Sequence, residues 1–294
     1  MNAKLAACLW LAATPALAQQ DFSKVEVKAE KVAEGVYMLT GAGGNMGLSV
    51  GKSGTYLIDD QYAPLSDKIV LAIRLITPDP VRFVVNTHWH GDHTGGNENL
   101  GKAGALLVAH ENVRKRMSTE QFMGALGRKV EPSPEGALPV VTFTDAVTFH
   151  WNGDEIRAYH VPPAHTDGDV IIHFVKADVV HMGDVFVNGG YPFIDTSSGG
   201  RIDGVIGAAE LVLAGISEKT RLIPGHGPLG TKADLQAWHD GLKTLRDRIA
   251  KLKAEGKTRD QAIAAKPTAD YDAKWGTGFM KGDTFTGLVY DSLP

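Results

Sequence analysis

The sequence contains little cysteine, little charge imbalance and no long apolar segment beyond its first residues. Its 294 residues include one cysteine, Cys8, which excludes an intrachain disulfide. Acidic and basic side chains nearly cancel, 34 against 30, whereas a nucleic-acid binder normally carries a basic surface. We therefore expect no nucleic-acid partner. A chain of this length can bury roughly 75% of its unfolded surface, so a hydrophobic core must supply the stability.

Residues 1–18 have the pattern of an export signal. Lys4 precedes an almost wholly apolar segment over 5–17, and Ala16-Leu17-Ala18 fits the small-x-small rule for cleavage before Gln19. The segment is shorter than the roughly 20 residues that span a bilayer. Lipid attachment at Cys8 is an alternative, but almost no apolar run precedes this residue. We expect a mature chain over 19–294, located in a periplasm, with no membrane partner after cleavage.

The mature chain divides into two halves, about 25–130 and 140–294, each with strands followed by helices. A Pro- and Gly-rich stretch over 131–139 separates them. This pattern predicts two sheets between helical layers, and by itself leaves open whether the halves are separate domains. The first half has strand patterns at 35–40, 55–59 and 81–86 and a helical pattern at 65–76. The second has strand patterns at 140–143, 146–150, 155–160, 170–175, 179–182 and 221–223, and helical patterns at 203–213 and from Thr231, where Thr231 and Asp234 resemble a capping box.

A histidine cluster directly follows the expected strand over 81–86. The sequence Thr87-His88-Trp89-His90-Gly91-Asp92-His93 places four ligand-type side chains, His88, His90, Asp92 and His93, within six residues. Imidazole nitrogens and carboxylate oxygens are zinc ligands in proteins. A polar loop with incidental histidines is the alternative, and the density of ligand types argues against it. The cluster therefore predicts a metal site at the end of this strand, with Trp89 packed beneath it.

Three later residues complete a ligand set. His165, Asp184 and His226 each follow an expected strand, over 155–160, 179–182 and 221–223. Taken singly, His165 or His226 could be structural, as we expect for His110, His173 and His181. Taken with the cluster at 88–93, they indicate one shared site and hence one domain. The imidazole-rich set favours zinc, and manganese or iron at the carboxylate-richer part remains an alternative.

The order His-x-His-x-Asp-His, then His, Gly-Asp and Gly-His-Gly resembles the metallo-β-lactamase superfamily. The resemblance covers most of the mature chain, from about residue 25 to 255. The resemblance implies an α/β fold, a four-layer αββα sandwich, built as one domain over 19–294. It also implies two zinc ions at one edge of the sandwich. It assigns His88, His90 and His165 to the first zinc, and Asp92, His93 and His226 to the second. Asp184 would contact the second zinc and could bridge both.

This resemblance implies a hydrolase without a protein nucleophile. Two zinc ions about 3.5–4 Å apart can share a hydroxide that attacks a carbonyl carbon, and Asp92 would orient it and pass on its proton. Export fits a β-lactamase, our first expectation. At the position of Asp184, however, many zinc β-lactamases have cysteine, and another branch has serine. An aspartate there is similar to hydroxyacylglutathione thioesterases and lactonases, and such an activity is our second expectation. A periplasmic metal-binding or relay protein without turnover is the third.

Four residues are candidates for contacting a small-molecule substrate. Val187 stands where the cysteine-bearing branch has a lysine, so Arg201 is the candidate cation, with a solvated loop arginine as the alternative. Asn188 and Tyr191 could donate a hydrogen bond to an oxyanion. The glycine-rich turn over 41–47 is expected either to be a mobile hairpin over the metals, with Met46 as a soft apolar contact, or a simple tight hairpin. The sequence leaves the oligomeric state open.

Overall fold

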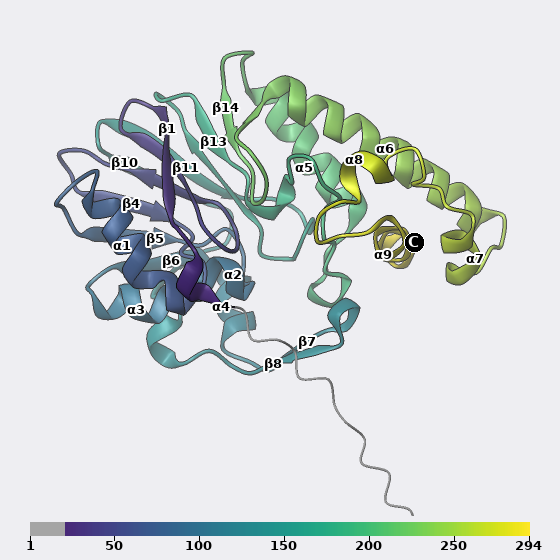
Figure 1. Cartoon of the computed structure of the whole chain (residues 1–294), viewed down its shortest axis with the longest axis horizontal. Coiled ribbons are helices and arrows are strands. Elements are labelled where there is room, and N and C mark those ends of the chain that lie inside the picture. Colours follow the sequence, from purple (N-terminus) through teal and green to yellow (C-terminus); the bar gives the residue numbers. More distant parts are fainter. Residues whose placement is uncertain (1–20) are drawn as a thin grey trace, which may run out of the picture.

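The computed structural model describes residues 21–294, and two mixed β-sheets form its centre (Figure 1). The expected export signal over 1–18 and Cys8 lie outside the described residues. The first sheet has the order β1-β2-β3-β4-β5-β6-β9 and the second β10-β11-β12-β13-β14-β15, while β7 and β8 form a separate hairpin. Within 21–294, none of the helices combines the length and apolar character needed to cross a membrane.

The strands are short, as in many α/β domains. The first sheet comprises β1 Lys28–Ala33, β2 Val36–Thr40, β3 Met46–Ser49, β4 Thr55–Ile58, β5 Val81–Val85, β6 Leu106–His110 and β9 Val141–Phe143; the hairpin is β7 Gln121–Met123 and β8 Arg128–Val130. The second sheet comprises β10 Ala146–Trp151, β11 Asp154–His160, β12 Val170–Phe174, β13 Val179–His181, β14 Arg221–Ile223 and β15 Gly230–Thr231.

Helices cover the outer face of each sheet. They are α1 Ser66–Arg74, α2 Gly91–Thr94, α3 Asn97–Lys102, α4 Glu111–Met117, α5 Ile202–Gly215, α6 Lys232–Ala254, α7 Arg259–Ala264, α8 Asp272–Trp275 and α9 Gly282–Ser292. In Figure 1, α1 and α3 lie beside the first sheet and α5 and α6 on the opposite side of the molecule. The short 3₁₀ helices that concern the site are η3 Gly124–Leu126, η5 Gly183–Val185 and η6 Thr196–Ser198.

Three layers of buried apolar side chains hold the four structural layers together. One cluster joins side chains of both sheets, such as Ile58 and Ile172, and is the core between them. A second joins the first sheet to α1, and a third joins the second sheet to α5 and α6. The predicted αββα sandwich is therefore confirmed.

The longest helix forms as its sequence predicts. Thr231 is the N-cap of α6, and Thr231 and Asp234 make the reciprocal hydrogen bonds of a capping box. Its apolar stripe belongs to the same core as Val180 and Leu222 of the second sheet, so α6 packs on that sheet. The buried residues of the stripe are Leu235, Trp238, Leu242, Leu245 and Ile249.

The strand expected over 140–143 lies in an unexpected place. It forms β9, which pairs in parallel with β6 and ends the first sheet, so the two sheets divide the chain after Phe143. Its local pattern is that of any short strand and carries no information about its neighbour. The Pro- and Gly-rich stretch before it therefore lies between two strands of one sheet.

Strand direction explains why the ligand-bearing loops converge. β11 and β13 are both antiparallel to β12, and β14 is parallel to β13, so the carboxyl ends of β11, β13 and β14 lie at one edge of the second sheet. The loop after β5 of the first sheet reaches the same edge, where Val170 N donates to Thr87 O (2.8 Å). Loops at such an edge commonly carry functional side chains.

Candidate metal centre

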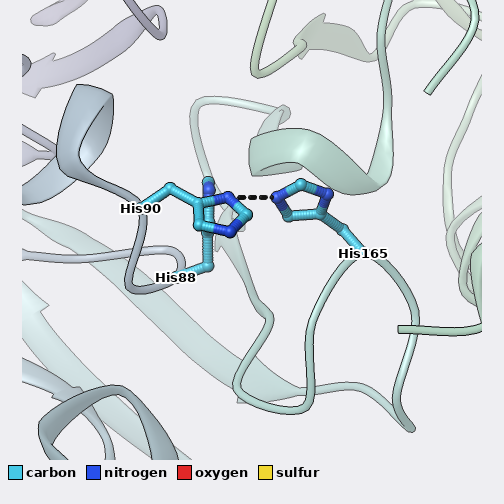
Figure 2. Close-up of side chains that lie close together, drawn as sticks. All are labelled: His88, His90 and His165. Atoms are coloured by element: carbon cyan, nitrogen blue, oxygen red, sulfur yellow. Dashed lines mark hydrogen bonds between the residues drawn. The ribbon is translucent and has the colours of Figure 1, made fainter. Parts of the chain in front are cut away.

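Three histidines from two sheets meet at this edge. His88 and His90 come from the loop after β5, and His165 comes from the loop between β11 and β12. One ring nitrogen of each lies within 4.8 Å of the others. Figure 2 shows the rings of His90 and His165 facing each other, with His90 Nδ1 2.8 Å from His165 Nε2. We call these three residues the first triad.

A second group of ligand-type side chains adjoins the first triad. Asp92, His93 and His226 form a cluster with the same spacing, which we call the second triad, and Asp184 of η5 lies next to it. His226 Nε2 lies 3.4 Å from Asp92 Oδ2 and 3.3 Å from Asp184 Oδ2. Asp184 Oδ1 lies 3.1 Å from His93 Nε2. All seven residues predicted as ligands are thus brought together.

The side chains around this centre fit a metal ion. Within residues 21–294, His88 Nε2 is buried without any hydrogen-bond partner, and His93 Nε2 and Asp184 Oδ1 are buried and make no well-oriented hydrogen bond although they lie 3.1 Å apart. A buried polar atom without a partner is costly, and a cation bound to these atoms removes that cost. Because nitrogen and carboxylate oxygen are the donors present, the set matches the ligands that zinc takes in proteins.

Four imidazoles are oriented by oxygen atoms behind them. His90 Nε2 lies 3.0 Å from Asp195 Oδ2, and His165 Nδ1 lies 2.6 Å from the carbonyl oxygen of Phe193. Because both of these oxygens only accept, the rings donate there and present their other nitrogen to the centre. The two facing nitrogens would then both carry lone pairs at 2.8 Å, which requires a shared proton or a cation between them.

Asp59, at the end of β4, orients the other two rings. Its Oδ2 lies 2.8 Å from His93 Nδ1 and accepts from Thr87 Oγ1, also at 2.8 Å. Thr87 Oγ1 in turn lies 3.0 Å from His88 Nδ1. The sequence offered only a faint signal for Asp59, a carboxylate directly after a buried strand, and none for Asp195. Partners of this kind fix the tautomer of a metal-binding histidine.

The charges of the centre depend on one another. Burial lowers the pKa of His165 to about 4, so its ring is neutral at pH 7. Burial disfavours the charged form of His226, yet the neighbouring Asp184 outweighs this effect and raises its pKa to about 10. Burial also opposes ionisation of Asp92, but His93 and His226 lower its pKa to about 2. Metal binding at the second triad would therefore displace protons from imidazoles.

Residues 39–236 match the family described as the metallo-beta-lactamase superfamily. The chain belongs to this superfamily. It is also 24% identical over 147 residues to a hydroxyacylglutathione hydrolase of Pelagibacter ubique (strain HTCC1062), covering 50% of this chain and 52% of that protein. The chain thus spans about half the length of this curated relative, and 34% of a second one, from Erythrobacter litoralis (strain HTCC2594).

Solved structures show the same fold. A metallo-beta-lactamase from Pontibacter korlensis superposes with a TM-score of 0.60 at 20% identity, covering 74% of this chain and 99% of that one. The sec-alkylsulfatase Pisa1 from Pseudomonas sp. superposes with a TM-score of 0.70 at 18% identity, covering 90% of this chain and 50% of the sulfatase.

In this member of the metallo-beta-lactamase superfamily, the glycine-rich turn over 41–47 packs against the ligands. Gly44 N donates to Asp92 O (3.1 Å), and a Cβ at Gly44 would overlap the His93 ring. Asn45 Nδ2 donates to the carbonyls of Pro224 (3.0 Å) and Gly227 (2.8 Å), on both sides of His226. The turn therefore supports both histidines of the second triad, a role that neither sequence expectation included.

Two predicted substrate contacts are wrong because their side chains lie inside the protein. Met46 is fully buried and packs with Leu39, Leu48 and Leu57 between the first sheet and its helices. Tyr191 is 3% exposed. Its hydroxyl donates to Asp272 Oδ1 at 2.8 Å, and its ring stacks on Phe285. Neither side chain can reach a substrate at the metal centre.

The other two predicted substrate contacts, Asn188 and Arg201, are not buried in the core. One N–H of the Asn188 side-chain amide donates to the carbonyl of Pro228 (3.0 Å); an amide has a second N–H donor, so Asn188 stays a candidate. Arg201 is exposed at the N-cap of α5, and its guanidinium makes no ion pair within residues 21–294. Arg201 thus stays a candidate. Trp89 packs beneath the ligands as predicted, and its Nε1 donates to Ser198 Oγ (3.1 Å).

Replacing Asp59 by asparagine should weaken zinc binding by about 10–100-fold, the usual cost of losing such a partner. Asp59 accepts hydrogen bonds on both oxygens, from Thr87 N and Thr87 Oγ1 as well as His93 Nδ1. An amide has one accepting oxygen and cannot serve all three. Zinc affinity is measured by competition with a chromophoric chelator. Asp247→Asn, at a side chain 61% exposed on α6, is the control, and equal affinities in both variants would contradict the role of Asp59.

Proposed function

We propose that the protein is a dinuclear zinc hydrolase that cleaves the bond between the acyl carbon and the leaving group of a small molecule. The observation that supports this best is the place of Asp184 between the triads. Its Oδ2 faces His165 Nε2 (3.6 Å) of the first triad and its Oδ1 faces His93 Nε2 (3.1 Å) of the second. A carboxylate in this position can contact a metal in each group.

The two carboxylates of the centre, Asp92 and Asp184, differ in their access to a substrate. Zinc bound at this centre would supply a Lewis acid and a water molecule with a pKa lowered towards 7. The side chain of Asp92 is 24% exposed, compared with 9% for Asp184. Asp92 is therefore the carboxylate of the centre that a substrate can reach. Its carboxylate would take up a proton during attack and deliver it to the leaving group.

A thioester or ester, including a lactone, is the substrate class that we favour. Asp184 is the residue by which this chain resembles hydroxyacylglutathione hydrolases, and the matched curated relatives carry that name. Val187 stands where the cysteine-bearing β-lactamases have a lysine, which leaves Arg201 as the candidate cation for a β-lactam carboxylate. A β-lactam remains the second candidate, because the similarity to the Pontibacter korlensis metallo-beta-lactamase covers 99% of that enzyme.

The proposal includes a place in the cell. The apolar segment over 5–17 supports export before Gln19, which would locate the hydrolase in a periplasm. Its substrate would then be a small molecule that is present outside the cytoplasm. Fractionation of cells that express the full chain tests this part independently of catalysis.

The deciding experiment compares two substrates on the zinc-loaded mature chain. The expected result is a kcat/KM of about 10⁴ M⁻¹s⁻¹ or more, the low end for dedicated enzymes, on a hydroxyacyl thioester of glutathione, with a lower value on a chromogenic cephalosporin. The reverse order would move the proposal to β-lactams. A His88→Ala variant controls for contaminating enzymes, and rates equal to that variant on both substrates would overturn the hydrolase proposal.

A further inference from the structure

One aromatic side chain lies directly against the first triad. The ring of Phe193 stacks on that of His90 at an interplanar angle of 29°, with the ring centroids 5.8 Å apart. Its centroid lies 5.7 Å from that of the His165 ring. Its carbonyl accepts the hydrogen bond of His165 Nδ1. The half-buried ring also packs against the core between the second sheet and α5 and α6, and against a smaller buried cluster that includes Trp89 and Val113. Its position beside the candidate ligands is therefore fixed by backbone and side-chain contacts together.

A second aromatic side chain extends this surface into solvent. Phe279, in the segment between α8 and α9, stands edge-on to Phe193 with centroids 6.4 Å apart and an interplanar angle of 87°. Its side chain is 74% exposed. We call these two rings the Phe193–Phe279 platform. It leads from two candidate metal ligands to the surface, and it joins parts of the chain that are distant in sequence.

Burial of apolar surface on folding does not explain an aromatic side chain at position 279. A side chain as exposed as Phe279 leaves most of its apolar area in water, so it contributes little to stability. Single exposed apolar residues are ordinary, but this one is continuous with the candidate active centre. On the side of Phe193, the first triad is thus bordered by an aromatic ring that leads to a second, exposed one.

We propose that the Phe193–Phe279 platform binds the apolar acyl chain of the substrate. This proposal rests on the hydrolase function proposed above and names the part of the substrate that gives selectivity. With the acyl carbon at the metal centre, a chain longer than acetyl would lie along Phe193 and cover Phe279. Both rings are apolar, and the ammonium of Lys281, on the same segment as Phe279, donates to the carbonyls of Gly276 (2.9 Å) and Thr277 (3.3 Å), so an apolar chain is the complement that the rings favour.

Chain-length dependence tests the platform. Each fully buried methylene group is worth about fourfold in affinity, and partial burial of several should raise kcat/KM by about tenfold from the acetyl to the hexanoyl thioester of N-acetylcysteamine. In Phe279→Ala, the ratio of the hexanoyl to the acetyl value should fall about three- to tenfold. Phe279→Leu, which keeps an apolar side chain, should retain an intermediate ratio. Leu75→Ala, at an 84% exposed residue after α1, is the control and should keep the original ratio.

A binding measurement separates this proposal from the hydrolase proposal. The dissociation constants of hexanoate and acetate are measured by calorimetry on the zinc-loaded protein and on Phe279→Ala. A preference for hexanoate over acetate in the original chain that is reduced in the variant would support the platform. This holds even if no thioester is hydrolysed faster than by His88→Ala, because that result would overturn the hydrolase proposal alone. Equal chain-length ratios in the original chain and Phe279→Ala would overturn the platform.

Discussion

Replacing Asp184 by asparagine should lower kcat/KM by on the order of 10³-fold or more. The carboxylate of Asp184 faces both triads: Oδ1 lies 3.1 Å from His93 Nε2, and Oδ2 lies 3.6 Å from His165 Nε2 and 3.3 Å from His226 Nε2. A neutral amide keeps the shape but removes the negative charge that faces both groups, and one side of the amide becomes a donor. Interactions with a catalytic metal are worth several kcal/mol, and each 1.36 kcal/mol is tenfold in rate. The rate is measured on the best substrate, together with the zinc content.

The control separates loss of the metal centre from loss of fold. Asp203→Asn changes a carboxylate whose side chain is 54% exposed on α5, and it should keep both the rate and the zinc content. An Asp184→Asn protein that bound zinc fully and retained near-original turnover would contradict the role that we give this carboxylate. Such a result would leave the two triads as independent sites.

Replacing Gly44 by alanine should reduce turnover by about 10²-fold and lower zinc affinity. The added Cβ would overlap the His93 ring, which is buried and held from behind by Asp59. Either the ring or the turn over 41–47 must move. Displacement of a catalytic group by about 1 Å can cost 10²-fold in rate. The two readouts are kcat/KM and the zinc dissociation constant.

Gly91 provides the matched control within the same motif. A Cβ at Gly91 would meet no atom within 4 Å, and its φ is not in the left-handed region. Gly91→Ala should therefore leave zinc affinity unchanged although it lies between His90 and Asp92. If both alanine variants behaved alike, the close approach of Gly44 to His93 would not be what positions the ligand.

Features that depend on a few consecutive residues, such as strands, a helix cap and the ligands of one loop, could be predicted from the sequence. All seven predicted ligands follow strands whose apolar patterns are evident in the sequence, and the capping box at Thr231 marks the start of α6. The spacing His88-x-His90-x-Asp92-His93 makes the ligands of one loop adjacent whatever surrounds them. The family resemblance then supplied the layers of the sandwich, because the order of the ligand motifs is specific to it.

The failed predictions concern side chains whose direction depends on packing. Met46 ends a glycine-rich turn and Tyr191 follows Asp184 along the chain, but the pairing of β3 and the packing of α9 turn both side chains into the core. Nothing in the residues beside them specifies that direction. The place of β9 in the first sheet is a similar case, since a three-residue strand fits the edge of either sheet equally well.

The sequence by itself determined which atoms can bind metal, their order along the chain, and the start of the longest helix. These properties depend on residue type and spacing over a few positions. Only the tertiary structure decided which oxygens orient each imidazole, as Asp59 and Asp195 do from other loops, and which aromatic rings lie beside the ligands. The reason is physical: these contacts join segments far apart in the chain, and strand pairing and core packing alone bring such segments together.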